Sequence, residues 1–386
     1  MESPLIASMR AVSSLICSVF ILMSGFGLAN YVVPLRALGE GWTATDIALI
    51  GMVYSAGYTL ASFITPKFIR RTGHIRVFAA NIALMVVSIL LCALVADLYA
   101  WMAFRSMFGF AIASSYLIME SWINEKAENE YRGFMFSVYM VTAMGGTIAG
   151  PYIASLGDVM NTALFIVAAI ILASAVFPVA LSASSTPTPP TVVGFDLKSL
   201  WLRSPVAFVG TFLSGVIAGA WLNFAAVFAK MSGLTETGGA NLIAAITVGA
   251  IVAQFPLGRA SDYIDRRAVM VFCCILGVIA GLWMFTLDAR HEYQLYMAAC
   301  LSGMVMFPIY SLNVAHANDM ALPGEFVRIS SGITVLYGVG IILGPLVGGQ
   351  AIAYAGPSGL PMVLAFFFAI YGGYATYRIL RRPVKA

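Results

Sequence analysis

Long stretches without a single charged residue leave this chain few possible folds. The decapeptide GRASDYIDRR, residues 258–267, carries five charges, yet 22 uncharged residues end at Gly258 and 20 more begin at Ala268. A helix needs roughly 20 mostly apolar residues to cross a hydrocarbon layer about 30 Å thick. Comparable uncharged runs recur along the chain at 11–35, 47–66, 77–96, 133–157, 204–229, 237–258, 268–287 and 293–318.

Four further spans complete the prediction. The run 159–195 holds one span before the polar stretch SASSTPTPPT, and 329–377 holds two, separated by YAGPSGLP. Residues 101–123 supply another, despite Arg105 and Glu120. Only 10% of the residues are charged, against about 25% in a soluble protein. The sequence therefore predicts an all-α integral membrane protein with twelve transmembrane helices. The first span is too long for a signal-peptide core of roughly 7–15 residues, so we expect it to be a helix of the protein.

Lysine and arginine predict the orientation in the membrane, because cytoplasmic loops retain them. With the N-terminus inside, 17 of the 21 basic residues fall on the cytoplasmic side. We therefore expect both termini in the cytoplasm of a bacterial cell, with the chain in the inner membrane. The net charge of +4 then reflects topology and gives no indication of nucleic-acid binding. All five cysteines fall within predicted spans without metal-ligand spacing, so no metal site is expected.

An internal repeat divides the chain. Three features recur after 192 to 194 residues: the pairs Gly150-Pro151 and Gly344-Pro345, the pairs Asn124-Glu125 and Asn318-Asp319, and the basic segments PKFIRRTGHIR and GRASDYIDRR. Duplicated six-helix units are common in transporters. The repeat predicts two pseudo-symmetric six-helix halves, residues 1–181 and 199–386, joined by a cytoplasmic linker at 182–198 that is rich in Ser, Thr and Pro.

These motifs also carry a family resemblance. GRASDYIDRR is similar to the loop signature of the major facilitator superfamily, RSMFGFAIA looks like its fourth-helix motif, and the stretch around Gly150-Pro151 looks like its fifth-helix motif. The resemblance covers the whole chain and implies a secondary transporter that works by alternating access. MESWINEKAENEYRG and PIYSLNVAHAND resemble a group of short, largely uncharacterised bacterial members. Short members from related bacteria include riboflavin importers, to which the chain is also similar.

Arg105 is the leading candidate for contact with a substrate. It lies about four residues inside its span and shares one helical stripe with Tyr116 and Glu120 by 3-and-4 spacing. An ionisable group in a span normally faces protein or water, which predicts a cavity cation for an anionic or carbonyl-bearing substrate. The alternative is that Arg105 extends to the outer headgroups. The candidate cavity residues are Arg105, Asn30, Tyr116, Asn223, Tyr54 and Tyr310.

Asn30 and Asn223 occupy corresponding positions in the repeat, 193 residues apart. Amides at that depth need partners, so they either bridge helices or line the cavity. Most of the tyrosines within spans are expected to pack between helices, and those that face a cavity would suit a flat ring system.

The resemblance implies a second set of residues, which control opening and closing. In the superfamily the residue that matches Asp262 faces the start of a helix in the opposite half. The resemblance therefore implies that Asp262 pairs with Arg132 and that this contact favours the outward-open state. The first copy of the motif has Arg70 at the place of this acid. Two simpler alternatives remain for these residues. The arginines of the decapeptide could act only as a topology signal, and Glu125 and Arg132 could form only a solvent-exposed ion pair. The gating candidates are Asp262, Arg266, Arg132, Glu125, Glu120, Asp319, Gly150, Pro151, Gly344 and Pro345.

The chain offers few candidates for proton coupling, namely Glu120 and His316, and His316 has the alternative of a hydrogen-bonded gate residue. No nucleotide-binding loop or nucleophile–base pair is present in the sequence, so neither an enzyme nor a cofactor is expected. We expect a monomeric carrier of a neutral or weakly anionic aromatic or heterocyclic solute, such as a riboflavin-like vitamin. Its partners are then this small molecule, the lipid bilayer and, if transport is coupled, protons. The alternatives are a proton-coupled drug or metabolite efflux antiporter and a membrane sensor or scaffold that does not transport.

Overall fold

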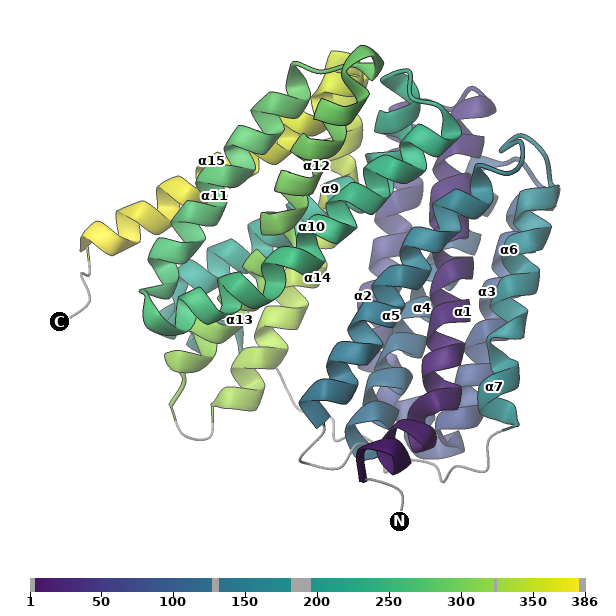
Figure 1. The fold of residues 1–386 in the computed structure, drawn as a ribbon, viewed down its shortest axis with the longest axis horizontal. Helices are drawn as coiled ribbons and strands as arrows, with labels where there is room; N and C mark the ends of the chain where they lie inside the picture. Colours follow the sequence, from purple (N-terminus) through teal and green to yellow (C-terminus); the bar gives the residue numbers. More distant parts are fainter. Residues whose placement is uncertain (1–3, 127–131, 182–195, 323–324, 382–386) are drawn as a thin grey trace. The chain divides into compact units, whose positions relative to one another are not determined.

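The computed structural model describes residues 4–126, 132–181, 196–322 and 325–381, and these residues form helices and short connections without any strand (Figure 1). Side chains are also left undescribed at 4–12, 125, 126, 132, 326 and 327. The elements are α1 (Pro4–Gly39), α2 (Ala44–Thr72), α3 (His74–Leu94), α4 (Leu98–Lys126), α5 (Arg132–Ala154), α6 (Ala163–Ser174), α7 (Val176–Ala180), α8 (Leu197–Arg203), α9 (Pro205–Met231), α10 (Glu236–Tyr263), α11 (Arg266–Phe285), η1 (Ala289–His291), α12 (Glu292–Met306), α13 (Pro308–Asp319), α14 (Phe326–Ala355), η2 (Gly356–Ser358) and α15 (Gly359–Arg381).

The prediction of twelve membrane spans is confirmed. Eleven segments of the described chain are long and apolar enough to cross a membrane, and the last of them, Arg328–Arg381, contains both α14 and α15. Two spans are interrupted: α6 and α7 form one, and α12 and α13 form another. The second break comes at Phe307, directly before Pro308, because proline has no N–H to continue the helical hydrogen bonds.

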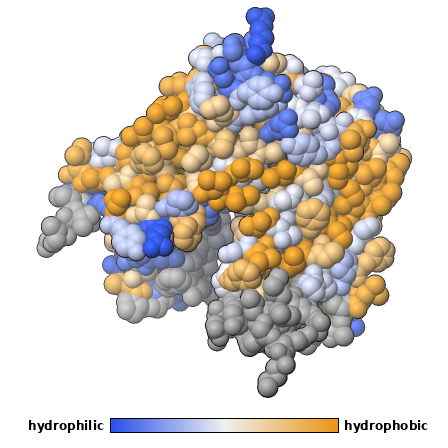
Figure 2. All heavy atoms as spheres, in the orientation of Figure 1, coloured by the Kyte–Doolittle hydropathy of each residue, from blue (hydrophilic) through white to orange (hydrophobic). Residues whose placement is uncertain are grey.

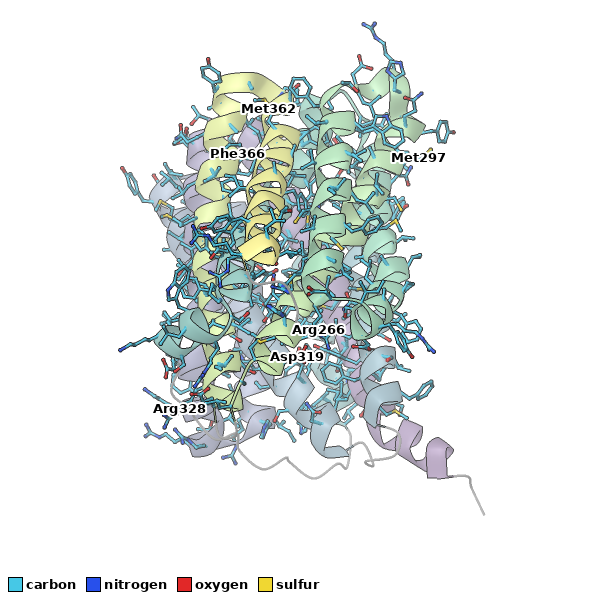
Figure 3. The ribbon with its side chains drawn as sticks, turned by 90° about the vertical axis from the view of Figure 1, so that its left-hand side faces the viewer. Arg266, Met297, Asp319, Arg328, Met362 and Phe366 are labelled. Atoms are coloured by element: carbon cyan, nitrogen blue, oxygen red, sulfur yellow. The ribbon has the colours of Figure 1, made fainter. Side chains whose placement is uncertain are left out.

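Large apolar side chains cover much of the exposed surface, as the orange areas of Figure 2 show for one face. Met297, Met362 and Phe366 are among them and lie on the outer surface in Figure 3. Soluble monomers rarely expose extensive apolar patches. Such a surface is suited to acyl chains, so the chain is a multi-pass membrane protein.

Two compact units make up the chain. Unit 1 comprises Met1–Gly41 and Val53–Val192, and unit 2 comprises Trp42–Met52 and Val193–Ala386. Within unit 1, α1 packs against α5 and α6, and α3 packs against α4 and α6. Within unit 2, α9 packs against α14, α10 against α12, and α11 against α15. The first turns of α2 thus group with unit 2, while the linker at 182–198 stays a prediction.

The closest helix contacts in unit 1 occur at glycines. A methyl group on Gly57 of α2 would collide with the carbonyl oxygen of Ser106 on α4. In the other direction, a methyl group on Gly109 of α4 would collide with the carbonyl oxygen of Tyr54 on α2. These two glycines therefore let the backbones of α2 and α4 approach each other closely, as small residues do in membrane helix pairs.

Unit 2 repeats this contact between α10 and α12. A methyl group on Gly249 would meet the carbonyl oxygen of Cys300, and one on Gly303 would meet that of Ile246. The two glycines lie 192 and 194 residues after Gly57 and Gly109, respectively. The internal repeat found in the sequence is thus reproduced at the level of single backbone contacts.

Most of the decapeptide GRASDYIDRR is helical, although the sequence suggested a loop. Helix α10 continues through Tyr263, and α11 begins at Arg266. Asp265 makes this short turn possible, because its side chain accepts a hydrogen bond from the backbone N–H of Arg267 at 2.9 Å and caps α11. The corresponding turn in unit 1 is made by Gly73, whose φ of 85° favours glycine.

We predict that Gly303→Ala destabilises the protein by about 1–3 kcal/mol, because α10 and α12 would have to separate around the added methyl group. Gly373→Ala on α15 is the matched control, since nothing lies within 4 Å of a methyl group there. That control should be neutral or more stable by up to about 1 kcal/mol from helix propensity. Thermal unfolding of both variants in detergent checks this, and equal melting temperatures would contradict the close contact.

Candidate functional site

Arg105 on α4 is buried inside unit 1, with only 4% of its surface exposed. Its Nη2 donates a hydrogen bond to Oδ1 of Asn30 on α1 at 2.6 Å. The central carbon of the guanidinium group lies 4.6 Å from the ring centre of Tyr54 on α2 and 4.8 Å from that of Phe108. Three helices therefore hold the charged group, and the alternative that Arg105 extends to the outer headgroups is wrong.

The guanidinium group still has unused hydrogen-bonding capacity. Its Nε and Nη1 are buried and donate to no partner. Among the residues that the structure describes, no carboxylate forms an ion pair with Arg105. A buried charge without a counter-ion is expensive, so its presence within a membrane span points to a functional role.

The other polar residues of the α4 stripe continue away from Arg105. The hydroxyl group of Tyr116 lies 2.9 Å from the sulfur of Met23 on α1. One turn further along, the half-buried Glu120 interacts electrostatically with Tyr139 of α5, whose buried hydroxyl group has no hydrogen-bond partner. Polar groups without a hydrogen-bond partner thus occur in unit 1 at Arg105 and at Tyr139.

Unit 2 lacks a cation at the corresponding depth. By the spacing of the repeat, Ala299 and Ile246 stand where unit 1 has Arg105 and Tyr54. Asn223 donates from Nδ2 to the carbonyl oxygen of Gly219 in its own helix at 2.8 Å. Tyr310 packs against Tyr337, with ring centres 4.4 Å apart. Four of the six predicted cavity residues therefore belong to unit 1, and the other two, Asn223 and Tyr310, belong to unit 2.

Arg266 organises the polar end of unit 2. Its Nε lies 2.5 Å from Oδ2 of Asp319 at the end of α13, and its Nη2 lies 3.2 Å from Oδ1 of Asp262 on α10. Its Nη1 donates to Oγ of Ser261 at 2.8 Å. Figure 3 labels Arg266 and Asp319 where α11 and α13 meet. One guanidinium group therefore connects α10, α11 and α13, and Asp262 pairs within its own unit.

The side chain of the partner expected for Asp262 is not described. The side chains of Arg132 and Glu125 are not described, so the pairing of Asp262 with Arg132 stays a prediction. The carboxylate of Asp262 is 62% exposed, which leaves it accessible to a partner besides Arg266.

A second ion pair at this end was missed by the sequence reasoning. Arg267 donates to Asp265 from Nε and from Nη2, the latter at 2.8 Å. Burial alone would raise the pKa of Asp265, but the hydrogen bonds and charge of Arg267 hold it below its ordinary value. An Asp directly before a helix start was the signal for this cap. His316 is buried and interacts electrostatically with Asp265, Asp319 and Arg267.

The two Gly-Pro pairs lie within continuous helices at equivalent contacts. Gly150 of α5 packs against the backbone of Gly27 on α1, and Gly344 of α14 packs against that of Gly219 on α9. Pro151 and Pro345 follow inside the same helices. The glycines thus permit close packing in both units, and bending at the prolines stays a prediction. In the described part of the chain, no cluster of three or more His, Cys, Asp or Glu residues has the arrangement of a metal site.

Comparison with known proteins agrees with the fold. Residues 15–249 and 233–386 match the Major Facilitator Superfamily. An uncharacterised MFS-type transporter of Yersinia pestis (strain Pestoides F) is 24% identical over 345 residues, covering 87% of each chain. One from Enterobacter sp. (strain 638) is 23% identical over 343 residues, again with 87% of each chain covered. The crystal structure of the nucleoside transporter NupG has a TM-score of 0.81 at 12% identity, covering 98% of this chain and 100% of NupG.

We predict that Arg105→Met raises the melting temperature of the purified protein, because it removes a buried charge that lacks a counter-ion. Replacing buried ionic groups by apolar residues of similar size gains about 1–4 kcal/mol in favourable cases. Asn30→Ala is the contrasting variant and should lower the melting temperature, since it removes the one hydrogen bond that Arg105 makes. A lower melting temperature for Arg105→Met would contradict the view that the site is costly to the fold.

Proposed function

The chain belongs to the major facilitator superfamily, and we propose that its cargo is a small organic molecule that joins an anionic or carbonyl group to an aromatic or heterocyclic ring. The observation that carries this proposal is Arg105, a buried cation whose Nε and Nη1 have no partner. A substrate with acceptor oxygens could accept hydrogen bonds from these two nitrogens and so offset the free-energy cost of burying them without a partner. The uncompensated charge is then a binding element for the substrate.

The surroundings of Arg105 restrict how such a group can bind. Tyr54 and Phe108 lie close to the guanidinium carbon, and Asn30 fixes Nη2. The planar guanidinium group donates within its own plane, in a fork that matches a carboxylate. The N–H of Nε and those of Nη1 point to different sides of the guanidinium group, so we expect an oxygen of a carboxylate, or of a carbonyl group of a flat ring, to approach in that plane at either nitrogen.

Aromatic side chains support a flat substrate. Tyr54 and Tyr58 lie with ring centres 6.5 Å apart in unit 1, and Tyr310 and Tyr337 form an aromatic pair within unit 2. Riboflavin-like vitamins remain one example of such a compound, although none of the relatives described above points to them. Nucleosides are a second example, since NupG is a nucleoside transporter, but at 12% identity it supports the fold alone.

Transport by alternating access then follows from the architecture of the superfamily, with both termini on the cytoplasmic side. The 17 basic residues predicted on that side support this orientation. Asp262 would exchange Arg266 for a partner on unit 1 as the carrier cycles. We keep Arg132 as that partner.

We predict that Arg105→Gln lowers uptake at least about tenfold, because a charge-assisted hydrogen bond contributes about 1.5–3 kcal/mol. The substrate is first found by thermal shift of the purified protein with vitamins, nucleosides and organic acids, and then tested by counterflow in liposomes. Arg105→Lys should retain part of the activity, because a point charge replaces the fork. The control is Arg290→Gln, since Arg290 is highly exposed.

Wild-type uptake by Arg105→Gln would contradict this role for Arg105. Absence of counterflow for every solute in the wild type would instead favour a sensor or scaffold.

Proton-coupled exchange is the second candidate, favoured by Glu120. This half-buried acid interacts with Tyr139 and forms no ion pair with a cation among the side chains that the structure describes. If Glu120 carries the proton, Glu120→Gln should abolish the dependence of transport on a pH gradient while counterflow at equal pH persists. Measuring both activities in the same liposomes distinguishes coupling from substrate binding, and an unchanged gradient dependence would exclude Glu120 as the carrier.

A further inference from the structure

Unit 2 contains a cavity of about 550 Å³ that the transport site does not account for. It lies where α8, α9 and α15 meet the turn between α10 and α11 and the end of α13. Its basic lining residues are Arg203, Arg266, Arg267, Arg378 and His316. Four arginines around one cavity predict an anionic ligand, because guanidinium groups bind phosphate and carboxylate oxygens well.

The acidic residues of the lining do not cancel this charge. They are Asp262, Asp265 and Asp319, and each forms an ion pair with Arg266 or Arg267. Four arginines against three aspartates leave one positive charge in the lining.

Two arginines are available to a ligand. Arg203 pairs with Glu325 at 3.2 Å at the surface, and such exposed pairs contribute about 0–1 kcal/mol. Arg378 forms no ion pair with any side chain that the structure describes.

Two helix starts add to the positive potential. Helices α9 and α11 both begin at this cavity, at Pro205 and Arg266. The first amide groups of a long helix favour a negative charge nearby. Ser204 and Asp265 cap these helices with their side chains and also line the cavity, so the two caps form part of its polar wall.

Exposed apolar side chains border the same cavity. Ile264 is 57% exposed and lines it together with the exposed Met320. On α8, Trp201 and Leu202 are exposed directly before Arg203, with Leu202 at 64%. Trp next to basic residues is typical of the boundary between headgroups and acyl chains. A soluble anion would not contact this apolar border, whereas the acyl chains of a lipid would pack against it.

We propose that the cavity binds the headgroup of a phospholipid with one negative charge and a hydroxylated headgroup, as in phosphatidylglycerol. The phosphodiester lies between Arg378 and Arg203, where it neutralises the surplus charge. Arg266 contacts Oδ1 of Asp262 and Oδ2 of Asp319, and the second oxygen of each carboxylate accepts a hydrogen bond from a headgroup hydroxyl. Basic pockets between membrane helices bind anionic headgroups in this way.

The test measures lipid binding by the full chain, purified in detergent and freed of lipid. Native mass spectrometry gives the dissociation constants of phosphatidylglycerol, phosphatidylethanolamine and phosphatidylcholine with identical acyl chains, and thermal shift gives that of glycerol 3-phosphate. Phosphatidylglycerol should bind the wild type at least about tenfold more tightly than the other lipids and than glycerol 3-phosphate. Arg378→Gln should remove this preference.

Arg381→Gln is the matched control, because Arg381 lies on the same helix but stacks on Tyr377 and does not line the cavity. It should bind phosphatidylglycerol as the wild type does. Arg203→Gln provides a second variant if Arg378→Gln melts earlier than the wild type without lipid. Equal phosphatidylglycerol binding by the wild type and both cavity variants would overturn the proposal. A preference for phosphatidylethanolamine, or equally tight binding of glycerol 3-phosphate, would overturn it as well.

Discussion

Hydrocarbon offers no hydrogen-bond partner to a peptide group, and this constraint accounts for most of the structure. A chain with so many uncharged runs satisfies its backbone by forming helices, as the described residues do. Helices in lipid gain little from the hydrophobic effect, so they associate through close packing. The contacts at Gly57, Gly109, Gly249 and Gly303 are the result. Against this background, an unsatisfied polar group inside the helices stands out, and Arg105 has two such nitrogens.

The two units share their backbone contacts but differ in chemistry. The glycine contact between α2 and α4 has a counterpart between α10 and α12, yet Arg105 and Tyr54 correspond to Ala299 and Ile246. Helix packing requires small residues at the same positions in both units. It does not restrict which side chains occupy the neighbouring positions. The costly cation of unit 1 therefore has no counterpart at the corresponding position of unit 2. Unit 2 instead carries a cluster of ion pairs at one end, around Arg266 and Arg267.

Local features of the sequence predicted the spans and the repeat, because hydropathy and the spacing of Gly-Pro pairs are visible in one dimension. The partners of the site residues were not predictable in this way. Arg105 and Asn30 are 75 residues apart, and nothing local indicates that Nη2 meets that amide. Asp262 pairs only four residues away with Arg266, but this required α10 and α11 to be nearly continuous, where the sequence suggested a loop. The helix cap at Asp265 could have been predicted from the local sequence, because an Asp directly before a helix start is a typical cap.

The pairing of Asp262 with Arg266 bears directly on how this acid can act as a gate. A partly exposed ion pair of this kind contributes about 0–1 kcal/mol. Breaking it would therefore cost little free energy if Asp262 were to pair with another cation. Arg266 does not become unpaired when Asp262 leaves, because Asp319 and Ser261 still bind it. The arginine is therefore held in place from α13 while the acid on α10 is free to change partners. In the proposed gate only one carboxylate would change partners, because Asp319 and Ser261 bind Arg266 independently of Asp262.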